Sequence, residues 1–226
     1  MEDFSDIVIV TDLDGTFFGK PTCIVERNMT AIDWLKARGG KFTIATGRMH
    51  HNMRKPIPNI CELVNAPIIA CNGALLYDII NEKTISENIM DYVSGFDLIK
   101  YTIEHFPSVG IRVSFPGGFI TTPEMATGNK LLRSDIEKNT VNAYRVMPLD
   151  SWTDFKWYKF VFRGEPEVVD RLREEVEPRY SDTVSFSKSG PKFFEAQGKG
   201  VNKALPLPVL REYCGEGNGK KITLVC

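Results

Sequence analysis

Three apolar runs near the N-terminus, each followed by polar or glycine-rich residues, constrain the fold more than any other feature. The runs are residues 6–11, 41–45 and 67–71, and segments with helical signals follow the first two at residues 28–38 and 48–64. Strands that alternate with helices form parallel sheets with right-handed crossovers. We therefore expect an α/β fold, with a Rossmann-like, doubly wound parallel sheet as its core.

The middle of the chain has a different pattern, which predicts a second module. Residues 156–162 (KWYKFVF) give a strong strand signal, and amphipathic helix signals lie at residues 92–106 and 168–176. The second of these helices is expected to stop before Pro178, because proline cannot donate a backbone hydrogen bond. Strands and helices mixed in this way predict a separate α+β unit.

The change of pattern sets the expected domain boundaries. We place the inserted α+β unit at residues 78–197, and the parallel-sheet domain at residues 1–77 plus 198–226. A hairpin expected from residues 74–77 and 84–87 crosses the first of these boundaries.

Composition excludes several classes of protein. Lys and Arg number 28 and Asp and Glu number 29, so the chain has no broad positive charge for nucleic acid or for an anionic membrane. No apolar run approaches the ~18 residues of a membrane span. The acidic start at Met1, Glu2 and Asp3 lacks a secretory signal, which predicts a cytoplasmic protein. The five cysteines lack metal-ligand spacing.

Two aspartates follow the first run, in the sequence Asp12-Leu13-Asp14-Gly15-Thr16. Ligands bind at the carboxyl ends of parallel strands, where both carboxylates can converge. One could attack phosphorus while the other handles the proton of the leaving group. The alternative is an ordinary Asp-Gly turn with two solvated acids. A calcium loop is excluded because its twelfth position is Cys23 instead of Glu.

The second and third runs also end in residues that suit an anion. Thr46, Gly47 and Arg48 offer a hydroxyl, a flexible backbone and a guanidinium at a helix start, and Asn72-Gly73 ends the third run. Taken alone, each could be an ordinary helix cap or turn. Three consecutive strand ends with such residues together predict a phosphate site.

These motifs identify a family resemblance. DxDGT at residues 12–16, TGR at residues 46–48 and NGA at residues 72–74 resemble the haloacid dehalogenase superfamily. They are most similar to its Cof-type (class IIB) phosphatases, which carry a large inserted cap. The segment GVNKAL at residues 200–205 resembles a further motif of that family, GVSKGxAL.

The resemblance implies a role for each site residue. Asp12 would be the nucleophile and Asp14 the general acid and base. Lys203 would balance phosphate charge, with Lys199 as the fallback. The implied phosphate-binding set is Thr46, Gly47, Arg48, Asn72 and Lys203. The implied cofactor is Mg²⁺, held by the Asp12 carboxylate and the Asp14 backbone carbonyl, and the cap would close over the site.

One family motif has no counterpart. An acidic GDxxND loop normally follows the strand at residues 222–226, but the sequence ends at Cys226. We therefore expect a chain truncated before that motif, with weaker magnesium binding. The strand would be left uncovered, which would allow two copies to pair as a homodimer.

The resemblance predicts a magnesium-dependent phosphomonoesterase that acts through an aspartyl-phosphate. Its substrate would be a sugar phosphate or a similar small phosphorylated metabolite. Two alternatives stay open. One is a phosphomutase of the same superfamily, and the other is an inactive truncated chain that only binds phosphorylated ligands.

Overall fold

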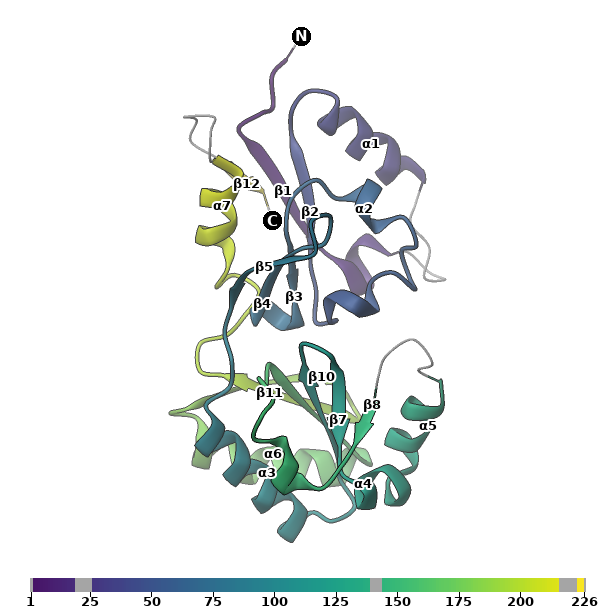
Figure 1. Cartoon of the computed structure of the whole chain (residues 1–226), viewed down its shortest axis with the longest axis vertical. Coiled ribbons are helices and arrows are strands. Elements are labelled where there is room, and N and C mark those ends of the chain that lie inside the picture. Colours follow the sequence, from purple (N-terminus) through teal and green to yellow (C-terminus); the bar gives the residue numbers. More distant parts are fainter. Residues whose placement is uncertain (1, 19–25, 139–143, 216–222, 226) are drawn as a thin grey trace. The chain divides into compact units, whose positions relative to one another are not determined.

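The computed structural model describes residues 2–18, 26–138, 144–215 and 223–225 (Figure 1). The chain forms two compact units. Unit 1 combines Met1–Glu87 with Asn202–Cys226, and unit 2 is the inserted segment Asn88–Val201.

Unit 1 contains a six-stranded sheet in the order β12-β1-β2-β3-β4-β5. The first four strands in this order are parallel, and β4 and β5 are antiparallel to their neighbours. The strands are β1 (Ile7–Asp12), β2 (Lys41–Ala45), β3 (Ile68–Ala70), β4 (Leu75–Asp78), β5 (Lys83–Glu87) and β12 (Thr223–Val225). The strand expected at residues 222–226 is described only over residues 223–225, and its first and last residues lie outside the described part of the chain.

Helices cover both faces of this sheet, as a doubly wound fold requires. Figure 1 shows α1 (Glu26–Lys36) and α2 (Ile60–Leu63) on one side and α7 (Leu207–Gly215) on the other. Leu210 and Cys214 of α7 pack in a core cluster with Val8 and Val10 of β1. The α/β class expected from the sequence is confirmed.

Two local expectations in unit 1 differ from the structure. The helical segment over residues 48–64, which Pro56 and Pro58 were expected to break, forms only a short turn at His50–Asn52 and the four-residue helix α2. The hairpin of β4 and β5 completes the sheet of unit 1, since β4 pairs with β3. The units therefore divide after Glu87 and Val201, later than at the predicted residues 77 and 197.

Unit 2 has a second six-stranded sheet, in the order β10-β11-β9-β6-β7-β8. All its pairings are antiparallel except β7 with β8. The strands are β6 (Gly110–Phe115), β7 (Gly118–Thr121), β8 (Tyr144–Val146), β9 (Lys159–Arg163), β10 (Val184–Gly190) and β11 (Phe193–Gly198). The helices are α3 (Tyr92–His105), α4 (Pro123–Gly128), α5 (Lys130–Lys138) and α6 (Pro166–Tyr180).

The core of unit 2 is aromatic and aliphatic. Phe160 and Phe162 of β9 pack with Leu98 of α3 and Leu172 of α6, all with no exposed surface. Helix α6 continues through Pro178, against expectation. A proline in the last turn removes only one backbone hydrogen bond, so the helix can end two residues later.

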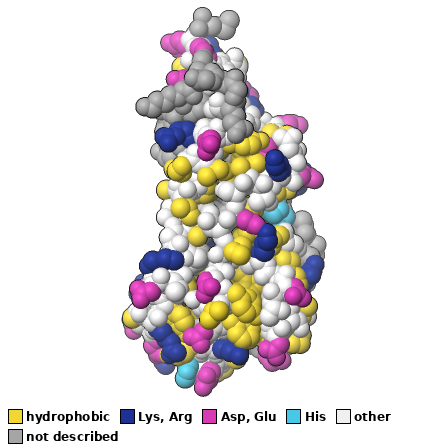
Figure 2. Space-filling model, turned by 60° about the vertical axis from the view of Figure 1, so that its left-hand side comes forward, with side chains coloured by type: hydrophobic (Ala, Val, Ile, Leu, Met, Phe, Trp, Pro, Cys, Tyr) yellow, Lys and Arg dark blue, Asp and Glu magenta, His cyan; other side chains and the backbone are white. Residues whose placement is uncertain are grey.

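On the face shown in Figure 2, basic and acidic side chains are interspersed, and the described residues form no broad basic area there. Within the described part of the chain, no helix has both the length and the apolar character to span a bilayer.

Candidate active site

The carboxyl end of β1 presents two aspartates. The strand is anchored by buried residues Val8 and Val10 and ends at Asp12. The chain then turns through Leu13–Phe17, whose first and last residues are buried. Gly15 provides the positive φ of +85° that this turn needs. The Asp12 and Asp14 side chains remain 35% and 50% exposed, so both carboxylates can reach a ligand.

The ends of β2 and β3 are hydrogen-bonded to each other beside β1. Thr46, which is buried, donates its backbone N–H to the Ile69 carbonyl at 2.8 Å. Asn72 donates its backbone N–H to the Thr46 carbonyl at 3.0 Å. Since β1 pairs with β2 up to the register Asp12–Ala45, the three predicted strand ends lie at one edge of the sheet.

Lys203 brings a cation to this edge from the far end of the sequence. Its Nζ donates to Asp12 Oδ1 at 2.5 Å, across a separation of 191 residues. The fallback, Lys199, instead donates to the Ser181 carbonyl in unit 2. The geometry therefore joins Lys203 to Asp12.

Gly73 allows the segment that carries Lys203 to pack closely against the turn after β3. A Cβ atom at Gly73 would lie 2.0 Å from the carbonyl oxygen of Asn202, and Gly73 has a φ of +94°. Only glycine permits this contact and this conformation. Sequence reasoning did not find the contact with Asn202, because a glycine after an asparagine signals a turn without naming what packs on it.

Arg48 contacts the second aspartate. Its Nε donates to Asp14 Oδ2 at 2.8 Å and its Nη2 donates to Asp14 Oδ1 at 2.7 Å. The hydrogen bond to Asp14 raises the pKa of Arg48, against the opposing effect of burial. Arg48 was predicted as a phosphate ligand, and in the structure its guanidinium lies on Asp14.

The oxygen donors at the end of β1 suit a hard divalent cation. Among the described residues, no group of three or more His, Cys, Asp or Glu side chains is arranged to hold a metal ion. Mg²⁺ is commonly held by one or two carboxylates together with water and substrate phosphate. Asp12 binds Lys203 through Oδ1 only, so the chemistry of its second oxygen fits such a site.

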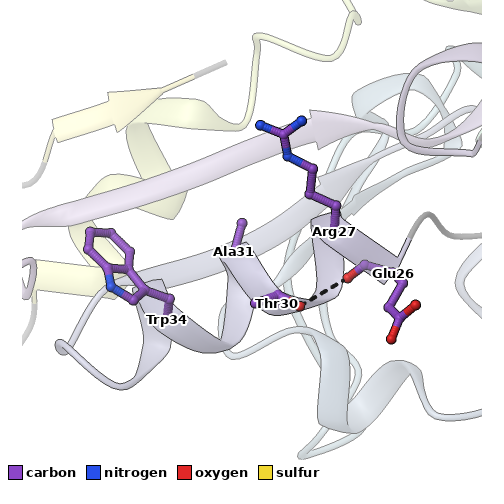
Figure 3. A pocket seen from close by; sticks show the side chains of 5 residues that line it. All are labelled: Glu26, Arg27, Thr30, Ala31 and Trp34. Carbon is purple, nitrogen blue, oxygen red and sulfur yellow. Dashed lines mark hydrogen bonds between the residues drawn. The ribbon is translucent and has the colours of Figure 1, made fainter.

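A separate shallow pocket lies on α1. It is lined by Glu26, Arg27, Thr30, Ala31 and Trp34, and Thr30 Oγ1 donates to the Glu26 carbonyl within it (Figure 3). None of the predicted site residues lines this pocket. The strand ends, where the ionisable groups converge, are therefore the candidate site.

Comparison with known proteins decides the family. A family model described as haloacid dehalogenase-like hydrolase matches residues 9–221. The chain belongs to this family. The membership confirms the resemblance drawn from the motifs and the predicted enzyme class, a haloacid dehalogenase-type phosphatase.

Relatives of this haloacid dehalogenase-like hydrolase cover most of its length. The 5-amino-6-(5-phospho-D-ribitylamino)uracil phosphatase YcsE of Bacillus subtilis is 25% identical over 216 residues, 95% of this chain and 74% of the relative. The solved structure of TM0651 from Thermotoga maritima is 25% identical, with a TM-score of 0.76 over 99% of this chain and 79% of that one. The subclass IIB sugar phosphatase BT4131 shares the fold, with a TM-score of 0.72 and 16% identity over 92% of this chain and 76% of that one.

Proposed function

We propose that this protein is a magnesium-dependent phosphomonoesterase that acts through an aspartyl-phosphate on Asp12. The observation that carries the proposal is the ion pair between Lys203 and Asp12 at the edge where three strands end. A lysine beside a nucleophilic carboxylate can neutralise a phosphoryl group as the carboxylate attacks it.

The phosphoryl group would be bound by donors from three segments. These are the Lys203 ammonium, the Thr46 hydroxyl and the backbone N–H of Gly47, with Asn72 as a further predicted member. The Arg48 guanidinium, which the sequence also placed in this set, contacts Asp14 in the structure. Thr46 Oγ1 already accepts a hydrogen bond from the Arg48 backbone N–H at 3.2 Å, which orients its hydroxyl group. Hydrogen bonds from these donors to an anionic phosphoryl oxygen would be charge-assisted, which makes them stronger than hydrogen bonds between two neutral groups.

The reaction would proceed in two steps. An Asp12 carboxylate oxygen forms a bond to phosphorus while the bond from phosphorus to the ester oxygen breaks, and Asp14 gives its proton to the departing alkoxide. Asp14 then takes a proton from a water molecule, which attacks the phosphorus of the aspartyl-phosphate and releases inorganic phosphate and free Asp12. Each positioned proton transfer contributes about 10²–10⁴-fold.

Magnesium would be held by the Asp12 carboxylate and the Asp14 backbone carbonyl. When bound, the ion would neutralise negative charge on the phosphoryl oxygens. Lys203 makes a parallel contribution from this chain's own residues.

The names of relatives support the substrate class. YcsE is a phosphatase of 5-amino-6-(5-phospho-D-ribitylamino)uracil, and BT4131 is a sugar phosphatase. We infer that the substrate is a sugar phosphate or a similar small phosphorylated metabolite. The predicted homodimer also stays a proposal, supported by the place of β12 as the outermost strand of its sheet among the described residues.

The test is phosphate release from p-nitrophenyl phosphate with and without magnesium. Wild type should release phosphate only with magnesium, and Asp12→Asn should release none, because an amide oxygen is a poor nucleophile. Asp33→Asn, an exposed change on α1, should match wild type. Turnover by Asp12→Asn would refute the assignment. Binding without release would favour the inactive chain, and return of phosphate to a sugar would favour a phosphomutase.

A further inference from the structure

The contact between Arg48 and Asp14 is bidentate, a more specific geometry than an exposed ion pair needs. Two hydrogen bonds, at 2.7 and 2.8 Å, hold both carboxylate oxygens on the Nε and Nη2 edge of the guanidinium. The side chains are 37% and 50% exposed. Pairs this exposed add little to stability, because water screens them and ordering two side chains costs entropy. The fixed geometry is therefore the feature to explain.

The backbone of Arg48 is fixed from two sides. Its N–H donates to Thr46 Oγ1 at 3.2 Å, and its carbonyl accepts the backbone N–H of Cys71 at 2.8 Å. These bonds tie Arg48 to the end of β2 and to the turn after β3. The guanidinium therefore extends from a rigid origin.

The Asp14 side chain has no such support of its own. It lies between buried Leu13 and flexible Gly15, and half of its surface is exposed. Among the described residues, Arg48 is the one hydrogen-bonding partner of its carboxylate. Without Arg48, the carboxylate could rotate freely about its side-chain bonds.

We propose that Arg48 is a positioning residue for Asp14, and this rests on the proposed phosphatase function. The guanidinium fixes the direction of the Asp14 carboxyl group toward the leaving group and later toward the attacking water. When one Asp14 oxygen carries the proton, the other still accepts an N–H from Arg48, so the orientation persists through both steps. A misplacement of about 1 Å in such a group can cost about 10²-fold in rate.

This role differs from that of a phosphate ligand in a measurable way. A phosphate ligand acts on the group that all substrates share, so its loss lowers kcat/KM equally for every ester. A residue that positions the general acid matters only where the leaving group needs a proton. An alkyl alkoxide needs one, whereas p-nitrophenolate leaves as a stabilised anion.

The experiment compares kcat/KM for p-nitrophenyl phosphate with kcat/KM for the sugar phosphate that wild type hydrolyses fastest in a screen. This parameter covers the steps up to departure of the leaving group. Arg48→Gln should lower it about 10²-fold for the sugar phosphate and less than about 3-fold for p-nitrophenyl phosphate. Arg48→Lys, which keeps the charge but has no bidentate edge, should show the same selective loss.

Three controls separate positioning from other effects. Lys203→Met, which removes a proposed phosphate ligand that contacts Asp12 and not Arg48, should lower kcat/KM by the same factor for both esters. Arg54→Gln breaks the exposed pair with Glu82 in the same unit and should change neither. In an Asp14→Asn background, Arg48→Gln should cause no further loss, because residues that act through one another are non-additive.

An equal loss for both esters, together with a raised inhibition constant for inorganic phosphate, would overturn the proposal and make Arg48 a phosphate ligand. A further loss on the Asp14→Asn background would overturn it as well. A wild-type protein that releases phosphate from no ester would instead refute the proposed function itself.

Discussion

Replacing Gly73 by alanine should disturb Lys203 without touching any charged group. Gly73 has a φ of +94°, which costs an L-residue about 1–2 kcal/mol. The new Cβ would lie 2.0 Å from the Asn202 carbonyl oxygen, whereas real Cβ contacts are essentially never under 3.0 Å. The segment before Lys203 must therefore move by about 1 Å, if the separation is to return to an ordinary contact distance.

Both stability and activity should fall. Backbone strain and overpacking together cost about 2–5 kcal/mol, a large part of the 5–15 kcal/mol that is typical of a domain. A displacement of about 1 Å at Lys203 should lower kcat/KM about 10²-fold. Urea unfolding gives the first quantity, and release of p-nitrophenol from p-nitrophenyl phosphate gives the second.

Gly39→Ala is the matched control. Gly39 has a φ of +85°, but its nearest neighbour to a new Cβ would be Ser5 Cβ at 3.2 Å. This variant should lose only about 1–2 kcal/mol from backbone strain and should keep its activity. If Gly73→Ala and Gly39→Ala lose equal stability and both remain fully active, the close approach of Asn202 does not position Lys203.

Two further predictions concern the stability of unit 1, through His50 and through the hydrogen bond between Tyr213 and Asp78. Burial lowers the pKa of His50 from 6.5 to about 4, so between these values the unfolded chain binds more protons and stability should fall as the pH drops. His50→Gln should flatten the dependence of the thermal midpoint on pH from 7 to 4, and an unchanged slope would contradict this. The Tyr213 hydroxyl donates to buried Asp78 at 2.8 Å and links α7 to β4. Tyr213→Phe should cost about 1 kcal/mol in urea unfolding with kcat unchanged, and an unaltered midpoint would show that this link is not stabilising.

The inserted unit shows which features of the fold the local sequence pattern predicts. Its strand and helix signals at residues 156–162 and 92–106 correspond to β9 and α3 within a few residues. The boundary of the inserted unit was harder to predict from the sequence, because the β4–β5 hairpin has the same local signals whichever sheet it joins. Pairing of β4 with β3 places the hairpin in unit 1, and that depends on tertiary packing.

By itself, the sequence determined the strand ends and the two aspartates. A β-branched run followed by Asp12, Asp14 and Gly15 is a local signal, because strand propensity and turn chemistry act over a few residues. The family resemblance ranked Lys203 above Lys199, and the tertiary structure placed Lys203 against Asp12 and Arg48 against Asp14. Lys203 and Asp12 are 191 residues apart in the sequence. They meet because the whole chain folds so that these two segments lie together, and local propensities, which act over a few residues, do not predict such a contact.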